Sequence, residues 1–176
     1  MSQMIDFAEI DYLKNGNERQ KKAYDILTKH HIFEKLQDYS PILAGTVPIE
    51  IDIEGSDLDI ICEVDLKSDD DFLDKVMFIR LTDVETKVEY PIVNGEKCIT
   101  LNFILDGFPI EIFGQNKPTK QQNAYLHMMA EYKILKQKGE EFKQRIIELK
   151  KQGIKTEPAF GMLLGLENPY EDLLKF

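Results

Sequence analysis

The sequence has few of the residues that would place it in several common functional classes. Only two of its 176 residues are cysteine and none is tryptophan. Two cysteines cannot enclose a tetrahedral zinc ion by themselves. Because Cys62 and Cys98 both stand in apolar stretches, we expect them to be reduced core residues. No apolar stretch reaches the length of a membrane span, and the first residues show no basic start followed by an apolar segment. These observations predict a cytoplasmic protein without a membrane partner.

Positive charge is also scarce. The formal net charge is -10, and the only arginines are Arg19, Arg80 and Arg145. A protein that holds a long nucleic acid usually presents a basic face to the phosphates, so we do not expect such a partner. A small triphosphate needs only a few local cations, and the charge balance does not exclude one.

What the sequence does have is the composition of an ordinary globular protein. Hydrophobic residues make up 43% of the chain and charged residues 31%, which excludes a disordered chain. Because 176 residues are one domain's worth of chain and no linker or repeat interrupts them, we predict a single domain over residues 1–176.

Apolar periodicity and turn residues predict the order of the elements. A helix is expected first, with residues 32–36 continuing its apolar pattern until Pro41 breaks it; strands with one helix among them follow, and finally helices. The expected helices are 17–30, 69–79, 119–138, 140–149 and one or two short helices within 153–176, and the expected strands are 42–44, 49–53, 57–64, 84–93, 97–105 and 108–113.

This order predicts an α+β fold. A mixed or mostly antiparallel central sheet is expected over about residues 40–114, flanked by helices, with a helical C-terminal part over about 118–176. The last three strands are joined by Asn94-Gly95 and Asp106-Gly107. Both dipeptides favour type I′ hairpins, whose two central residues need positive φ.

Two acids stand in an otherwise apolar strand. Asp57 and Asp59 are two residues apart, so both side chains leave the same face, while Leu58 and Ile60 face the core. Neighbouring carboxylates repel each other unless a cation lies between them, and Mg²⁺ is a hard cation that prefers oxygen ligands. The pair alone leaves two interpretations open, a metal site or solvated aspartates on an edge strand.

A third acid and a turn complete the pattern. Glu111 lies between Ile110 and Ile112, so its side chain should point away from the core and could lie beside the two aspartates. Three carboxylates can hold two Mg²⁺ ions for a phosphoryl-type displacement. Gly45-Thr46 follows a buried strand, where backbone N–H groups and a hydroxyl can approach a phosphate. Each of these features is also common in proteins without such a site.

The spacing of these features resembles the polymerase-beta-like nucleotidyltransferase superfamily. The matching residues are Gly45, Thr46, Ser56, Asp57, Asp59 and Glu111. The resemblance implies that the three acids bind Mg²⁺ or Mn²⁺, that Glu111 could activate an acceptor hydroxyl, and that Gly45, Thr46 and Ser56 contact the nucleotide. Glu at the third acidic position, where Asp is more usual, and the strand expected at 49–53 depart from the superfamily pattern.

Nearly the whole chain also resembles an uncharacterised bacterial family of single-domain proteins. That resemblance rests on residues 42–49, 56–62, 122–135 and 155–170.

Two functions follow from the resemblance. One is a Mg²⁺-dependent enzyme that moves a nucleotidyl group from an NTP, with ATP as the first candidate, to a small-molecule or protein acceptor. The other is a non-catalytic module on the same fold that binds a nucleotide or a protein partner. His127 and Glu131 are four residues apart on one expected helix, where they could line an acceptor pocket or form a plain surface pair.

Overall fold

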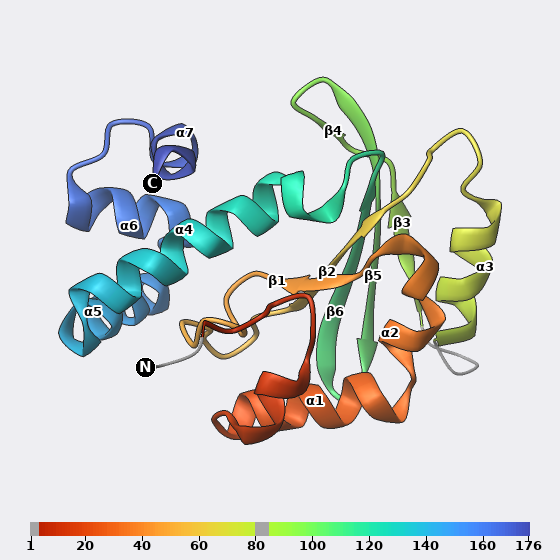
Figure 1. The fold of residues 1–176 in the computed structure, drawn as a ribbon, viewed down its shortest axis with the longest axis horizontal. Helices are drawn as coiled ribbons and strands as arrows, with labels where there is room; N and C mark the ends of the chain where they lie inside the picture. The colour runs from red at the N-terminus through yellow and green to blue at the C-terminus, as the bar shows by residue number, and fades with distance from the viewer. Residues whose placement is uncertain (1–3, 80–84) are drawn as a thin grey trace.

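The computed structural model describes residues 4–79 and 85–176, and within them the chain forms a six-stranded mixed sheet (Figure 1). Strand order is β1-β2-β6-β5-β3, and β4 pairs with β5. β2 and β6 run parallel, while the other pairs are antiparallel. The α+β class with a mixed sheet is as predicted. The strands are β1 (Ile42–Ala44), β2 (Leu58–Glu63), β3 (Lys87–Glu89), β4 (Ile92–Val93), β5 (Glu96–Leu105) and β6 (Phe108–Gln115).

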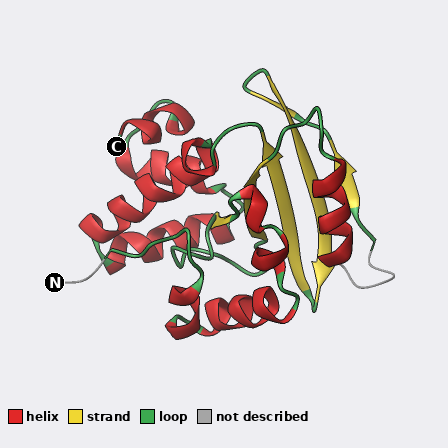
Figure 2. Ribbon diagram, turned by 45° about the vertical axis from the view of Figure 1, so that its right-hand side comes forward, coloured by secondary structure: helices red, strands yellow, loops and turns green. Residues whose placement is uncertain are grey.

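Helices cover both faces of this sheet (Figure 2). α1–α3 pack on one face of the sheet. The C-terminal helices pack around β1 and against the adjoining part of the opposite face. None of the helices in the described ranges is long and apolar enough to cross a membrane. Their bounds are α1 (Glu18–Lys29), α2 (Ile32–Lys35), α3 (Asp70–Ile79), α4 (Asn123–Lys138), α5 (Glu140–Lys151), α6 (Thr156–Leu164) and α7 (Pro169–Asp172).

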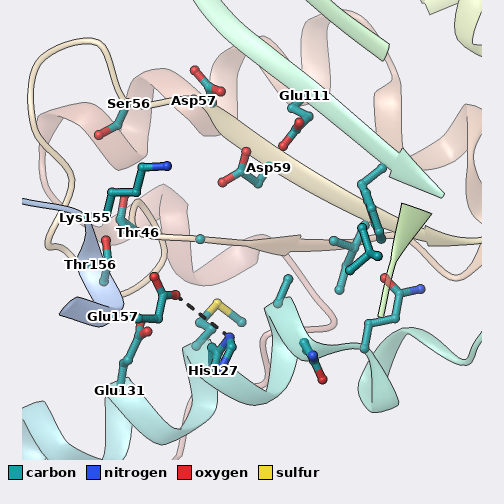
Figure 3. A pocket seen from close by; sticks show the side chains of 18 of the residues that line it. Thr46, Ser56, Asp57, Asp59, Glu111, His127, Glu131, Lys155, Thr156 and Glu157 are labelled. Atoms are coloured by element: carbon teal, nitrogen blue, oxygen red, sulfur yellow. Dashed lines mark ion pairs between the residues drawn. The ribbon is translucent and has the colours of Figure 1, made fainter. Parts of the chain in front are cut away.

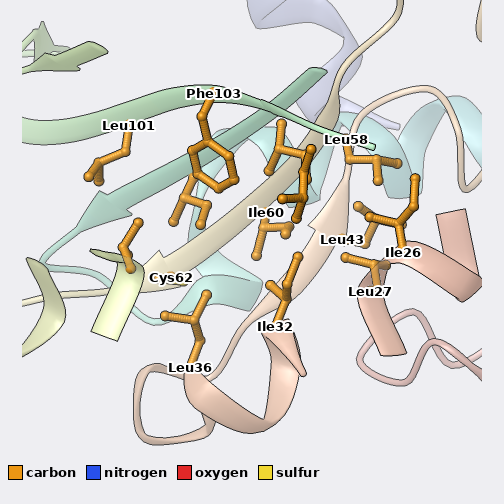
Figure 4. Close-up of a cluster of buried hydrophobic side chains, with 14 of the residues drawn as sticks. Ile26, Leu27, Ile32, Leu36, Leu43, Leu58, Ile60, Cys62, Leu101 and Phe103 are labelled. Carbon is orange, nitrogen blue, oxygen red and sulfur yellow. The ribbon is translucent and has the colours of Figure 1, made fainter. Parts of the chain in front are cut away.

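Side-chain alternation divides the buried residues into two clusters. Leu58, Ile60 and Cys62 point from β2 into the cluster beneath α1–α3, together with Ile110 and Ile112 of β6 (Figure 4). The residues between them leave the opposite face, as the alternation predicts. Ile61 accordingly belongs to the second cluster, under the C-terminal helices. Both cysteines are buried and unpaired.

The two predicted hairpin turns are confirmed. Asn94 and Gly95 have φ values of 51° and 79°, and Asp106 and Gly107 have 51° and 80°. The strand expected over 84–93 is divided into β3 and β4, and its first residue, Val84, lies outside the described residues.

The strand expected at 49–53 is wrong. Residues 47–50 form a turn, in which the Ile51 N–H donates to the Thr46 carbonyl at 3.1 Å. Ile49 and Ile51 are buried against the C-terminal helices and not within a sheet. Their alternation therefore reflects burial in a turn, which gives the same apolar pattern as a short strand.

Candidate functional site

All eight residues singled out in the sequence line one pocket of about 880 Å³. It lies between the β1, β2 and β6 edge of the sheet and helices α4 and α6 (Figure 3). The eight are Gly45, Thr46, Ser56, Asp57, Asp59, Glu111, His127 and Glu131. Their shared location is established by the structure, whereas the role assigned to each residue stays a prediction.

The centre of the site is a pair of carboxyl groups on neighbouring parallel strands. Asp59 of β2 and Glu111 of β6 are register partners. Burial, followed by repulsion from Glu111, raises the pKa of Asp59 to about 8. Burial also raises the pKa of Glu111, although hydrogen bonds from Asp59 and Asn102 oppose that rise. Burial and the neighbouring carboxyl therefore both disfavour a second negative charge at this pair.

Asp57 lies at the more exposed rim of the same pocket, and partial burial raises its pKa. The three carboxylates supply only oxygen donors, and the repulsion from Glu111 and Asp57 that helps raise the pKa of Asp59 would be relieved by a cation. Such a donor set fits Mg²⁺ or Mn²⁺. In the described ranges, no three His, Cys, Asp or Glu side chains are already closed around one point as they would be around an ion.

Gly45 is required where the turn approaches Asp59. Its φ is +84°, and a Cβ added there would stand 2.5 Å from Asp59 Oδ2. Real Cβ atoms essentially never approach another atom so closely. The glycine therefore lets the β1 turn pass directly beside the carboxyl pair, with Thr46 following at the pocket wall.

Ser56 shapes the other loop at the site. Its Oγ accepts a hydrogen bond from the Ile53 N–H at 2.9 Å, and its own N–H donates to the Ile53 carbonyl at 3.0 Å. These two bonds close the turn that delivers Asp57 to the pocket. The Ser56 hydroxyl proton is not used by the first bond, so the group can still donate to a ligand.

Two consecutive residues of α1 hold both loops in place. Arg19 donates to the Ser56 carbonyl at 3.2 Å, and its Nε lies 3.5 Å from Asp52 Oδ2. Gln20 is buried and donates to the carbonyls of Val47 and Pro48 at 3.0 and 3.3 Å. No motif in the sequence links α1 to these loops, so neither residue could be selected from the sequence.

The opposite wall comes from the C-terminal helices. Glu131 of α4 is only 3% exposed, and its Oε1 has no hydrogen-bond partner in the part of the chain that the structure describes. Burial, then repulsion by Glu157, raises its pKa well above the ordinary value. His127 Nε2 donates to the Tyr170 carbonyl at 2.7 Å, and its Nδ1 lies 4.0 Å from Glu157 Oε1 (Figure 3).

The pocket is also lined by three lysines that no sequence motif indicated. Lys150 of α5 is buried and donates to the Ile51 carbonyl at 2.6 Å, which ties α5 to the loop before Ser56. Burial lowers its pKa, against the attraction of Asp52, Glu131 and other carboxylates. Lys117 and Lys155 also border the cavity. Nothing in the sequence showed which of its lysines face inward.

Comparisons with known proteins give a family and a fold. A family model described as "Domain of unknown function (DUF4269)" matches residues 25–176. No curated protein matches.

Solved structures with a similar fold include the Cid1 poly(U) polymerase with MgGTP bound, at a TM-score of 0.57 and 14% identity over 80% of this chain and 46% of that one. A cytoplasmic RNA terminal U-transferase has a TM-score of 0.54 and 13% identity over 80% and 42% of the two chains. The polymerase core of TRAMP, an RNA surveillance complex, has a TM-score of 0.51 and 11% identity over 93% of this chain and 50% of that one. The chain thus has a nucleotidyltransferase-like fold and spans half the length of these structures or less.

Proposed function

The chain belongs to the DUF4269 family, and we propose that it is a nucleotidyltransferase. It would transfer the nucleotidyl group of a nucleoside triphosphate, with ATP as the first candidate, to a small-molecule or protein acceptor. The observation that carries this proposal is the juxtaposition of Asp59 and Glu111 in register, with Asp57 and the Gly45-Thr46 turn at the same pocket.

The chemistry follows from these positions. The Gly45-Thr46 turn and Ser56 would contact the triphosphate through backbone N–H groups and hydroxyls. Asp57, Asp59 and Glu111 would hold Mg²⁺ or Mn²⁺, which supplies positive charge beside the phosphates when bound. An acceptor oxygen then attacks the α-phosphorus, the bond from that phosphorus to the bridging oxygen breaks, and pyrophosphate leaves. Glu111 would take the acceptor's proton.

A small acceptor fits this chain better than a long nucleic acid. The net charge is -10, and five carboxylates line the pocket against three lysines. A polyanion would meet repulsion at such a surface. The pocket volume of about 880 Å³ lies within the roughly 300–1,000 Å³ of sites for small molecules.

The second candidate is a non-catalytic module that binds a nucleotide. The observation that favours it is that the three carboxylates are not closed around a common point in the described residues. Both functions predict nucleotide binding at Thr46 and Ser56, but only the first predicts a product.

Melting temperature and label transfer test the proposal together. At 100 times the dissociation constant, MnATP would add about 2.7 kcal/mol to wild-type stability, or roughly 5–10 °C. Asp59→Asn should lose most of this shift, while Asp25→Asn, which changes an exposed aspartate on α1, should keep it. Each α-³²P-labelled NTP is then offered with acceptor mixtures. A wild-type shift without any label transfer would favour the non-catalytic module, and no shift at all would refute both functions.

A further inference from the structure

Glu131 is a buried carboxyl group with an unsatisfied oxygen at the pocket wall. It is 3% exposed, and its Oε1 has no hydrogen-bond partner among residues 4–79 and 85–176. A buried polar atom without a partner costs about 1–3 kcal/mol, and such an atom at a pocket wall often marks a missing ligand donor. Figure 3 shows Glu131 and Glu157 together, across the pocket from Asp59 and Glu111.

The nearby cations do not satisfy this oxygen. Lys150 acts on Glu131 through its charge, but its hydrogen bond goes to the Ile51 carbonyl. His127 donates to the Tyr170 carbonyl and faces Glu157 only at 4.0 Å. The other charged group that acts on Glu131 is Glu157, a second acid, whose repulsion adds to burial in raising the pKa of Glu131. The buried Glu131 thus lies beside the partly exposed Glu157, and its Oε1 has no donor in the described residues.

We propose that Glu131 and Glu157 bind the ammonium group of an acceptor that also carries the hydroxyl to be modified. This inference rests on the proposed function and names the acceptor class. An ammonium group has three donors and no acceptor, so it would satisfy Glu131 Oε1 and separate the two acids. The hydroxyl of the same molecule would extend toward Glu111, lose its proton there and form the new bond to the α-phosphorus as pyrophosphate leaves.

The charge of the pocket supports a cationic acceptor. More acidic than basic side chains line it: the acids are Asp57, Asp59, Glu111, Glu131 and Glu157, and the lysines are Lys117, Lys150 and Lys155. A nucleoside triphosphate with two divalent ions has no net charge, so the loaded pocket would keep this negative excess. A neutral or anionic acceptor gains nothing from it, whereas a cation is attracted.

The test separates acceptors by charge. A microbial small-molecule extract is divided on a cation exchanger at neutral pH into retained and unretained fractions, and total RNA forms a third sample. Each is incubated with the wild-type chain, MgCl₂ and α-³²P-labelled ATP, CTP, GTP or UTP. We expect labelled product from the retained fraction only.

Glu131→Gln keeps the shape of the side chain and removes its charge. We expect it to raise the amount of retained fraction needed for half-maximal rate by roughly tenfold or more, with little change in maximal rate and in the MnATP melting shift. Glu157→Gln is the second variant should the first fail to fold. Glu148→Gln is the matched control, since this glutamate is exposed on α5, and it should behave as wild type.

The outcomes separate this inference from the proposed function. Label in the unretained fraction or in RNA would overturn the cationic acceptor and leave the transferase in place, as would wild-type acceptor dependence in both glutamine variants. No label from any nucleotide in any sample would overturn the transferase and this inference with it.

Discussion

Replacing Gly45 by alanine should damage the site more than the fold. The added Cβ would stand 2.5 Å from Asp59 Oδ2, whereas ordinary contacts begin near 3.4 Å. The carboxyl group or the turn must therefore shift by about 1 Å, and misplacement of this size can cost about 10²-fold in rate. The φ of +84° adds backbone strain of about 1–2 kcal/mol, which would lower the melting temperature by roughly 2–8 °C.

Gly107→Ala is the matched control for this strain. Gly107 has a φ of +80°, and an added Cβ would meet nothing within 4 Å. It belongs to the β5–β6 hairpin turn and does not line the pocket. Urea unfolding should therefore show comparable losses in the two variants, while the MnATP melting shift and label transfer should fall only in Gly45→Ala. Equal function in the two variants would refute the argument that Gly45 sets the position of Asp59.

Three further changes test other parts of the site. Arg19→Met removes the hydrogen bond to the Ser56 carbonyl and the ion pair with Asp52. Nucleotide titrations should show weaker binding, while urea unfolding should show a loss of only about 1 kcal/mol. Unchanged affinity would mean that the loop keeps its position without Arg19. Glu111→Gln keeps the shape of the side chain beside Asp59, so nucleotide should still bind while label transfer falls by on the order of 10²-fold. A transfer rate within threefold of wild type would exclude Glu111 from the chemistry. Burial raises the pKa of Glu131, so the folded state binds its proton more tightly than the unfolded chain, and wild-type stability falls as pH rises above the ordinary pKa near 4.5. In urea unfolding, Glu131→Gln should therefore gain stability over wild type progressively from pH 5 to pH 8. A constant difference between the two would contradict this reasoning.

The face of the sheet that carries the acids could be predicted from local pattern alone. Strand alternation places Asp57 and Asp59 opposite Leu58 and Ile60, and it separates Glu111 from its apolar neighbours. The two hairpin turns were predictable for the same reason, since Asn-Gly and Asp-Gly favour positive φ wherever they stand. Both properties depend on residues close together in the sequence. For the strands, a distant contact could reverse the two faces only by burying the charged side chains.

Local pattern failed where burial comes from distant helices. The alternation at Ile49 and Ile51 has the period of a strand, but both side chains are buried by the C-terminal helices while the backbone turns. An apolar residue at every second position reports which side chains are buried and not what covers them. The same limit hid Gln20, whose side chain holds the 47–48 backbone from 27 residues away.

Only the tertiary structure decided what completes the pocket. The parallel pairing of β2 with β6 makes Asp59 and Glu111 register partners across 52 positions of sequence. The packing of α5 and α6 brings Lys150 and Glu157 to the same cavity, and α1 brings Arg19 to its outer loop. Periodicity determines which face of an element is apolar, whereas the partner of each face depends on how the whole chain excludes water. The face that carries the acids could therefore be predicted from the sequence, whereas the contributions of α1, α5 and α6 to the pocket could not.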